Sequence, residues 1–117
     1  MGTRLEHDAS PNDRAPSGLP LRHLVSGAIG AGLYVGEQRL PPDGVVPRHT
    51  HPVEEVLIFL AGEGIAAYGD ESTTVGPGIT LYIPAGEPHG FHNTGAGELR
   101  VLLIFPTPEF AETVQTS

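Results

Sequence analysis

The sequence contains no cysteine and no lysine among its 117 residues. Without cysteine there is no disulfide, no thiolate nucleophile and no thiolate metal ligand, so any metal site must use His, Asp or Glu. All six basic residues are arginines, so no lysine amine is available to form a Schiff base or to act as a general base. Catalysis through a thiol or a primary side-chain amine is therefore excluded.

Positive charge is also scarce, with six basic residues against fourteen acidic ones and a formal net charge of −8. Such a chain repels phosphate backbones, which argues against nucleic acid as a partner. No run of about eighteen apolar residues is present, and the N-terminus lacks the apolar stretch of a secretory signal peptide. We expect a cytoplasmic protein without a membrane or nucleic-acid partner.

Glycine and proline, by contrast, are abundant at 16 and 12 residues. They separate short apolar runs, which is the pattern of many short strands joined by tight turns. The sequence therefore predicts an all-β sandwich or barrel. The expected strands are Leu21–Val25, Gly32–Leu40, Val45–His51, Val53–Leu60, Gly64–Tyr68, Ser72–Val75, Thr80–Ile83, His89–Asn93 and Leu99–Phe105.

The two ends of the chain differ in composition from this middle part. Residues 1–19 are rich in Pro, Asp, Asn, Ser and Gly and poor in apolar side chains, so they cannot bury enough surface to offset the entropy of ordering. We expect a flexible N-terminal arm over 1–19 and a single barrel domain over 20–117. A proline at a first-turn position and early acidic residues predict a short helix over Pro108–Val114.

Two of the expected strands are apolar on both faces. These runs are Val56–Leu60 and Val101–Phe105, and they differ from the alternating pattern of a strand with one face in water. One face fills the barrel, and the other needs a cover, which is a second sheet, the N-terminal segment or another subunit. We expect that cover to come from a second copy of the chain, in a homodimer.

Histidine and glutamate form a pattern typical of metal ligands. His49 and His51 share one face of a strand because side chains alternate, and Glu55 continues the same parity if the chain stays extended. Two imidazoles and a carboxylate suit Fe, Mn, Ni, Cu or Zn. His89, which follows a turn fixed by two prolines, is a candidate for a fourth ligand from a neighbouring strand.

At these residues the sequence resembles the cupins. The first stretch runs from Gly44 to Gly62 and reads GVVPRHTHPVEEVLIFLAG, and the second runs from Gly78 to Asn93 and reads GITLYIPAGEPHGFHN. Only the spacing of Gly44 departs from the family pattern, by one residue. The resemblance implies a jelly-roll barrel, commonly dimeric. It also implies that His49, His51, Glu55 and His89 bind one divalent transition metal (Fe, Mn, Ni, Zn, Cu or Co).

Four further residues are candidates for the pocket around such a metal. Tyr34 and Gln38 lie on the same face of one expected strand, where polar groups are unusual and suggest contacts with a substrate or with the ligands. Phe59 and Phe91 are candidates for its apolar wall, since Phe91 shares the parity of His89.

Other residues near the two stretches are expected to lie outside the site. Glu54 has the opposite parity to Glu55 and is expected in solvent, and His92 has the opposite parity to His89. We expect Arg48 at the surface or an interface and Asn93 at a turn. The glycines expected at positions of unusual φ are Gly44, Gly62, Gly78 and Gly86.

A centre of three imidazoles and one carboxylate supports several reactions on a small organic substrate. A metal there acts as a Lewis acid on a carbonyl or enediol or, as iron, brings O₂ and substrate together. We favour a dioxygenase-like enzyme. The resemblance leaves isomerase, epimerase, lyase and decarboxylase open, and a non-catalytic module that binds a small ligand is the other alternative.

Overall fold

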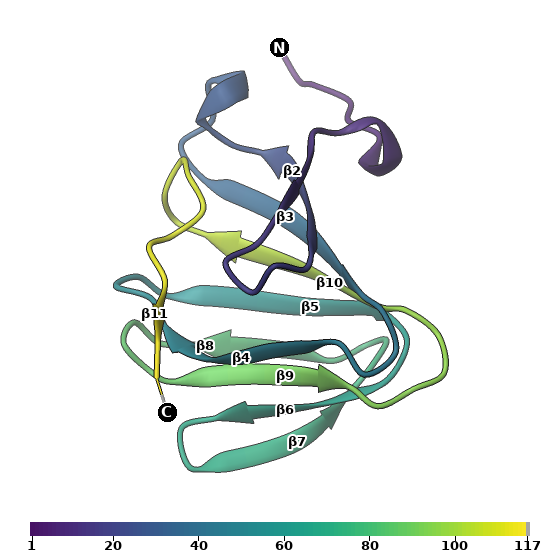
Figure 1. The fold of residues 1–117 in the computed structure, drawn as a ribbon. Helices are drawn as coiled ribbons and strands as arrows, with labels where there is room; N and C mark the ends of the chain where they lie inside the picture. Colours follow the sequence, from purple (N-terminus) through teal and green to yellow (C-terminus); the bar gives the residue numbers. More distant parts are fainter. Residues whose placement is uncertain (117) are drawn as a thin grey trace.

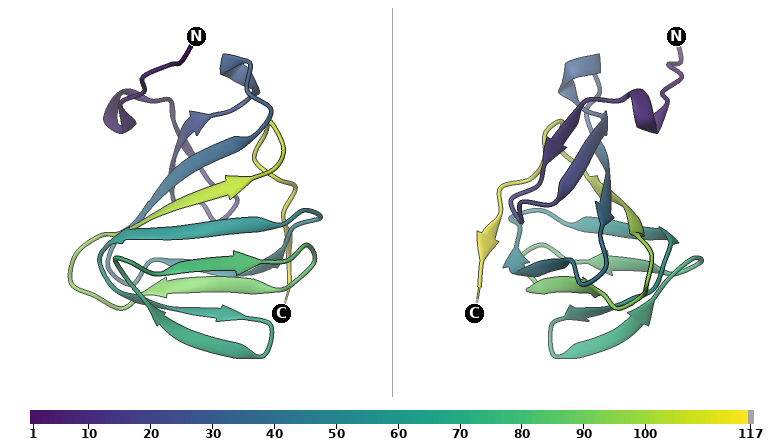
Figure 2. Two further views of the ribbon diagram at one scale, coloured as in Figure 1. Left: turned by 180° about the vertical axis from the view of Figure 1, so that it is seen from behind. Right: turned by 45° about the vertical axis from the view of Figure 1, so that its right-hand side comes forward.

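A computed structural model describes residues 1–116 as two antiparallel sheets that face each other (Figures 1 and 2). The first sheet has the order β1-β2-β3-β10-β5-β8 and the second has the order β11-β4-β9-β6-β7. The strands of the first are β1 (Asn12–Arg14), β2 (Pro20–Val25), β3 (Tyr34–Leu40), β10 (Leu99–Phe105), β5 (Glu55–Ala61) and β8 (Thr80–Ile83). Those of the second are β11 (Val114–Gln115), β4 (Val45–Thr50), β9 (His89–Asn93), β6 (Gly64–Tyr68) and β7 (Glu71–Val75). The prediction of an all-β jelly-roll barrel is confirmed.

The core lies between the sheets and follows the alternation of the strands. In β5, Leu57 and Phe59 are buried, and their neighbours Val56 and Ile58 on the outer face are half-buried. In β10 the inward residues from Leu99 to Phe105 are almost completely buried. Side chains of both sheets therefore fill the interior, except where polar residues gather at one end.

The N-terminal segment differs from the expectation of an arm separate from the barrel. Asn12–Arg14 pairs with β2 as an edge strand, and Ala15 joins the hydrophobic core. A short 3₁₀ turn, η1 (His7–Ala9), precedes it, and a second one, η2 (Gly27–Ile29), follows β2. The loop after β1 passes in front of β10 (Figure 1). The flexibility of residues 1–19 stays a prediction.

The helix predicted over Pro108–Val114 is wrong. Residues 106–113 contain neither helix nor strand, and Val114–Gln115 forms β11, which pairs with Thr50 and His49 of β4. Thr113 and Val114 are β-branched, and hydrogen bonds to a ready-made strand edge outweigh the weak preference of a short isolated helix. The C-terminal strand β11 therefore lies along β4, the strand that carries His49.

One glycine also differs from its prediction. Gly62, Gly78 and Gly86 have φ near +85°, as expected, whereas the turn before β4 places the positive φ of +64° on Asp43. Gly44 instead donates its N–H to Pro41 O, and a Cβ there would lie 2.9 Å from that oxygen. Close backbone approach, not left-handed φ, selects glycine at this position.

Over residues 1–116, the structure contains no helix long and apolar enough to cross a membrane.

Candidate metal centre

Strand β4 brings His49 to the interior through a local irregularity. Val46 pairs with Phe91 and His49 pairs with His89, so the register shifts by one residue at Pro47 and Arg48. Proline has no N–H to offer the ladder, which favours a bulge there. Because of this bulge, Val46 and His49 both face inward although they are three residues apart.

Gly90 of β9 makes the bulge sterically possible. A Cβ at this position would lie 2.6 Å from Val46 O and 3.1 Å from Arg48 N. Only a residue without a side chain allows the two backbones to approach so closely. Gly90 therefore sets the relative position of the His49 and His89 side chains, which lie on the neighbouring strands β4 and β9.

His51 and Glu55 flank the turn from β4 to β5. The carbonyl of His51 accepts a hydrogen bond from Gly86 N, which ties the β4–β5 turn to the turn before β9. Glu55 opens β5 opposite Ile83 and, like the three histidines, is almost fully buried. Two turns and three strands thus meet at one end of the barrel.

The side chains of His49, His51, Glu55 and His89 converge there. Their potential ligand atoms all lie within 4.8 Å of one another. The Nε2 atoms of His49 and His51 are 3.1 Å apart, and Glu55 Oε1 lies 2.7 Å from His89 Nε2 and 3.5 Å from His51 Nε2. The sequence alone thus identified a set of four residues that the structure brings together.

Each histidine is oriented by a hydrogen bond on its other ring nitrogen. Nδ1 of His49 donates to Pro47 O at 2.7 Å, that of His51 to Glu112 O at 2.9 Å, and that of His89 to Glu87 O at 3.0 Å. A proton on Nδ1 leaves the Nε2 lone pair free. Three such lone pairs and one carboxylate oxygen aimed at a common point fit a single divalent transition metal.

Burial and the carboxylate act on the histidines in opposite directions. Burial lowers the pKa of His49 to about 4 and also lowers the pKa of His51. For His89, burial lowers the pKa, but the hydrogen bond and charge of Glu55 outweigh it and raise the pKa above 6.5. Burial therefore favours the neutral, metal-binding form of His49 and His51, whereas Glu55 favours the protonated form of His89.

This difference predicts how metal affinity depends on pH. Because Glu55 favours the protonated form of His89, protons compete with the metal for this side chain, and we expect affinity to fall as the pH drops from 7.5 to 5.5, with net release of protons on metal binding. Calorimetric titrations in buffers of different ionisation enthalpy measure both quantities. An affinity that is constant over this range would contradict the assignment of His89 as a ligand.

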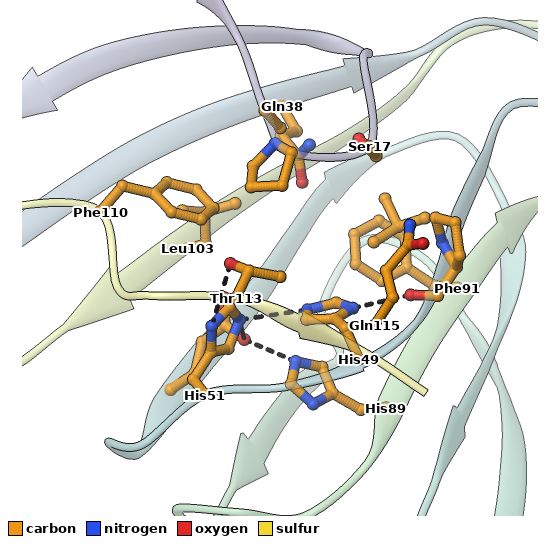
Figure 3. A pocket seen from close by; sticks show the side chains of 15 residues that line it. Ser17, Gln38, His49, His51, His89, Phe91, Leu103, Phe110, Thr113 and Gln115 are labelled. Atoms are coloured by element: carbon orange, nitrogen blue, oxygen red, sulfur yellow. Dashed lines mark hydrogen bonds and ion pairs between the residues drawn. The ribbon is translucent and has the colours of Figure 1, made fainter. Parts of the chain in front are cut away.

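A small cavity adjoins the four residues and has one polar end. Its volume is about 30 Å³, and Gln38, Phe91, Leu103, Phe110 and Thr113 are among the residues that line it (Figure 3). Gln38 and Phe91 were predicted for this pocket. Tyr34 and Phe59 were predicted too, but they do not line it: Tyr34 lies at a different hollow, and Phe59 packs edge-on against Phe91 in the core.

Sequence reasoning missed the residues that the two ends of the chain contribute. Ala15, Pro16 and Ser17 come from the loop after β1, and Phe110, Thr113 and Gln115 come from the C-terminal segment. The Thr113 hydroxyl lies 3.3 Å from His51 Nδ1. The β-branched pair Thr113–Val114 was a signal for a strand in the C-terminal segment. Nothing in the composition of residues 15–17 indicated that they line the cavity.

The residues expected outside the centre do lie outside it. Glu54 is exposed and accepts a hydrogen bond from the Tyr82 hydroxyl, and His92 is exposed near Asp43. Arg48 donates to Gly69 O at the surface. Asn93 is completely buried, and its amide donates to three backbone carbonyls around the loop that joins β9 to β10.

Comparison with known proteins agrees with this architecture. Residues 36–105 match the family model described as "Cupin domain". An uncharacterized protein from Streptomyces coelicolor is 32% identical over 105 residues, which make up 90% of this chain and 91% of the relative. The chain therefore belongs to the cupin family.

Two solved structures are similar to the whole fold. The polyketide cyclase RemF from Streptomyces resistomycificus superposes with a TM-score of 0.85 at 27% identity, covering 100% of this chain and 87% of RemF. Oxalate decarboxylase from Bacillus subtilis, a protein with Mn(II) centres, gives a TM-score of 0.77 at 26% identity. This chain spans 33% of the length of that decarboxylase.

Proposed function

We propose that this cupin is a metal-dependent enzyme for a small, neutral, largely apolar organic compound that carries a carbonyl or enol oxygen. The observation that carries the proposal is the buried cluster of three imidazoles and one carboxylate beside a cavity whose lining includes the amide of Gln38. His49, His51, Glu55 and His89 would hold the metal. When bound, the metal supplies Lewis acidity toward an oxygen of the substrate or, as a redox-active ion, reactivity with O₂.

The charge around the cavity favours a neutral substrate. No arginine of residues 1–116 lines it, and Glu55 is the one acidic residue of its lining. A small dianionic substrate would require cationic groups beyond the metal to balance its buried charge. The walls are apolar, from Val46, Phe91 and Leu103, which suits the uncharged reacting end of such a compound.

Gln38 is the group best placed to orient such a substrate. The residue is only 3% exposed, its side chain points toward the cavity, and no hydrogen bond joins its amide to the other residues that line the cavity (Figure 3). A polar atom of a ligand in the cavity can pair with this amide. An amide can donate to a carbonyl or accept from an enol.

Two reaction classes remain open on this centre. A dioxygenase-like reaction is the one that the ligand set suggested from sequence. The likeness to a polyketide cyclase supports the other class, a rearrangement or ring closure of an enolisable carbonyl compound without O₂. In both classes, Gln38 would orient the reacting oxygen, the four converging side chains would hold the metal beside it, and the apolar walls would exclude water.

A panel of β-dicarbonyl compounds and hydroxylated aromatic ketones tests the proposal. The protein is loaded with Fe(II), Mn(II) or Zn(II), and products are analysed by mass spectrometry beside an oxygen electrode. O₂ uptake with a mass gain of two oxygen atoms would establish a dioxygenase. Products of unchanged mass, or of mass reduced by one water, would establish isomerisation or cyclisation. Absence of turnover with metal bound would favour a non-catalytic binding module.

Replacing Gln38 by leucine separates substrate positioning from metal binding. We expect kcat/KM to fall about 10- to 100-fold, because one buried hydrogen bond contributes about 1–3 kcal/mol. Metal affinity should stay within about twofold, since Gln38 is not among the converging ligands. Steady-state kinetics and a metal titration on the same preparation measure the two effects. An equal loss of metal would assign Gln38 a structural role instead.

We further propose that the chain forms a homodimer in the cytoplasm through the outer face of the first sheet. Val56, Ile58, Leu102 and Ile104 lie there only half-buried, with Val56 opposite Ile104. Replacing Ile104 by glutamate should convert a dimer to a monomer in size-exclusion chromatography with light scattering. Replacing Ile65, exposed on the second sheet, by glutamate should not. A wild-type monomer would contradict this proposal.

A further inference from the structure

The cavity at the metal ligands is too small for an organic substrate. Its volume of about 30 Å³ leaves room for only a few water-sized groups. Ligand pockets for organic compounds usually have a volume of about 300–1,000 Å³. Only the reacting group of a substrate fits beside the ligands, so the rest of the molecule needs another place.

A second hollow, with a volume in the range usual for pockets that bind organic compounds, is also lined by Phe110. Its volume is about 700 Å³, and it is formed by the N-terminal segment, the end of β2, η2 and the C-terminal segment. Apolar side chains make up much of its lining, among them Leu5, Leu24, Ala28 and Ile29. Ile29 is 47% exposed, although large apolar side chains are usually covered.

Phe110 separates the hollow from the metal cavity and lines both of them. Its ring lies 6.1 Å from the ring of His51 on one side and 5.6 Å from the ring of Tyr34 on the other. The residue is half-buried and belongs to the segment 106–113, which has no regular secondary structure. Few backbone hydrogen bonds hold this segment, which favours local motion. Because Phe110 lines both spaces, a rotation of its side chain would join them.

The floor of the hollow carries a chain of hydrogen bonds. The Tyr34 hydroxyl lies 2.6 Å from His23 Nδ1, and His23 Nε2 lies 3.0 Å from the Asp13 carboxylate. With a proton on Nε2 donated to Asp13, Nδ1 accepts from Tyr34, so the hydroxyl oxygen keeps its lone pairs for a ligand. Tyr34 can lie there because Gly36 has no Cβ, which would be 2.6 Å from the hydroxyl.

Charges in the hollow are largely balanced. Arg4 forms an ion pair with Glu6 at 2.8 Å, and Glu109 is the remaining acidic residue of the lining. A lining of apolar groups, one free hydroxyl oxygen and no unpaired cation suits a neutral aromatic or polycyclic molecule with oxygen substituents. An anionic ligand would have no partner there.

We propose that this hollow binds the body of the substrate and that Phe110 is the gate through which its reacting end reaches the metal cavity. The inference rests on the proposed function, which it extends to a ring-containing substrate larger than the metal cavity. The Tyr34 hydroxyl oxygen, oriented by His23, contacts an oxygen substituent of the bound molecule, and Ala28 and Ile29 contact its rings.

Two hydroxamates with the same chelating group test the connection between the spaces. Acetohydroxamate carries a methyl group and naphthalene-2-hydroxamate carries two fused rings, and both are titrated into the metal-loaded protein. Replacing the exposed Ala28 by tryptophan fills the hollow, so affinity for the naphthyl probe should fall about tenfold, or about 1.4 kcal/mol, with acetohydroxamate unchanged. Replacing Ala96 by tryptophan, an exposed residue in the β9–β10 loop, is the matched control.

The gate has its own readout in the rate of binding. Replacing Phe110 by alanine should accelerate association of the naphthyl probe about tenfold and leave that of acetohydroxamate unchanged. Equal effects of Ala28→Trp on both probes, or none on the naphthyl probe, would overturn the assignment of the hollow. Equal rates for wild type and Phe110→Ala would overturn the gate.

A probe that does not chelate distinguishes failure of this inference from failure of the proposed function. The neutral compound 2-naphthol, whose hydroxyl can donate to the Tyr34 oxygen, should bind the metal-free protein, and Ala28→Trp should weaken this binding about tenfold. Fluorescence titration measures it without any metal. Absence of naphthol binding overturns the hollow as a site, whereas absence of metal binding with intact naphthol binding overturns only the proposed enzyme.

Discussion

Replacement of His49 by alanine is expected to abolish stoichiometric metal binding. The imidazole Nε2 lies 3.1 Å from that of His51, and its Nδ1 is held by Pro47 O, so the variant loses both a ligand and its orienting bond. Loss of an outer hydrogen bond alone typically costs 10- to 100-fold in affinity, and loss of the ligand should exceed about 100-fold. Elemental analysis after reconstitution and dialysis measures the bound metal.

Replacing His92 by alanine is the matched control for this experiment. His92 lies on the same strand as His89 but faces solvent near Asp43. The variant should retain one metal per chain. Equal metal content in the His49 and His92 variants would contradict the assigned ligand set.

Replacing Gly90 by alanine should have the next largest effect, on stability and on metal affinity together. The added Cβ would lie 2.6 Å from Val46 O and 3.1 Å from the backbone at Pro47 and Arg48. Neither neighbour is a flexible side-chain end, so the bulge must shift. We expect the metal-free protein to lose about 1–3 kcal/mol of unfolding free energy and metal affinity to fall at least about tenfold.

Gly97 provides the control for Gly90. A Cβ at Gly97 meets nothing within 4 Å, and its φ is not positive, so Gly97→Ala should change the unfolding free energy by less than about 0.5 kcal/mol. Urea denaturation followed by circular dichroism compares the two variants. If Gly90→Ala is as stable and binds metal as tightly as Gly97→Ala, the bulge does not position the ligands.

The strands of the barrel could be predicted because local signals agreed with one another. Gly64–Tyr68, Thr80–Ile83, His89–Asn93 and Leu99–Phe105 have the bounds predicted from turn residues and apolar alternation. Regular alternation also placed His49, His51 and Glu55 on one face. In these segments the core requires the structure that local propensity already favours.

The two segments that cover the metal cavity, the loop after β1 and the C-terminal segment, could not be predicted. Their positions depend on contacts between residues that are distant in the sequence. Residues 15–17 gain their place from the pairing of β1 with β2, and the C-terminal segment gains its place from β11 on β4. Each of these strands is only two or three residues long, too short for a recognisable pattern. The local helical pattern of Pro108–Val114 therefore pointed to the wrong structure.

The position of Tyr34 shows a second limit of alternation. Parity correctly places Tyr34 and Gln38 on the same inward face of β3. Parity does not give the direction of a long side chain along the strand, and Tyr34 lies over Gly36 to reach His23 on the neighbouring strand. Two residues of one face thus line two different spaces.

Anomalous diffraction from crystals grown with Mn(II), Fe(II) or Zn(II) tests the central claim most directly. We expect one strong peak per chain, at about 2.0–2.3 Å from Nε2 of His49, His51 and His89 and from a carboxylate oxygen of Glu55. A peak held by other residues, or no peak in crystals that contain the metal, would contradict the assignment of these four residues as a metal centre.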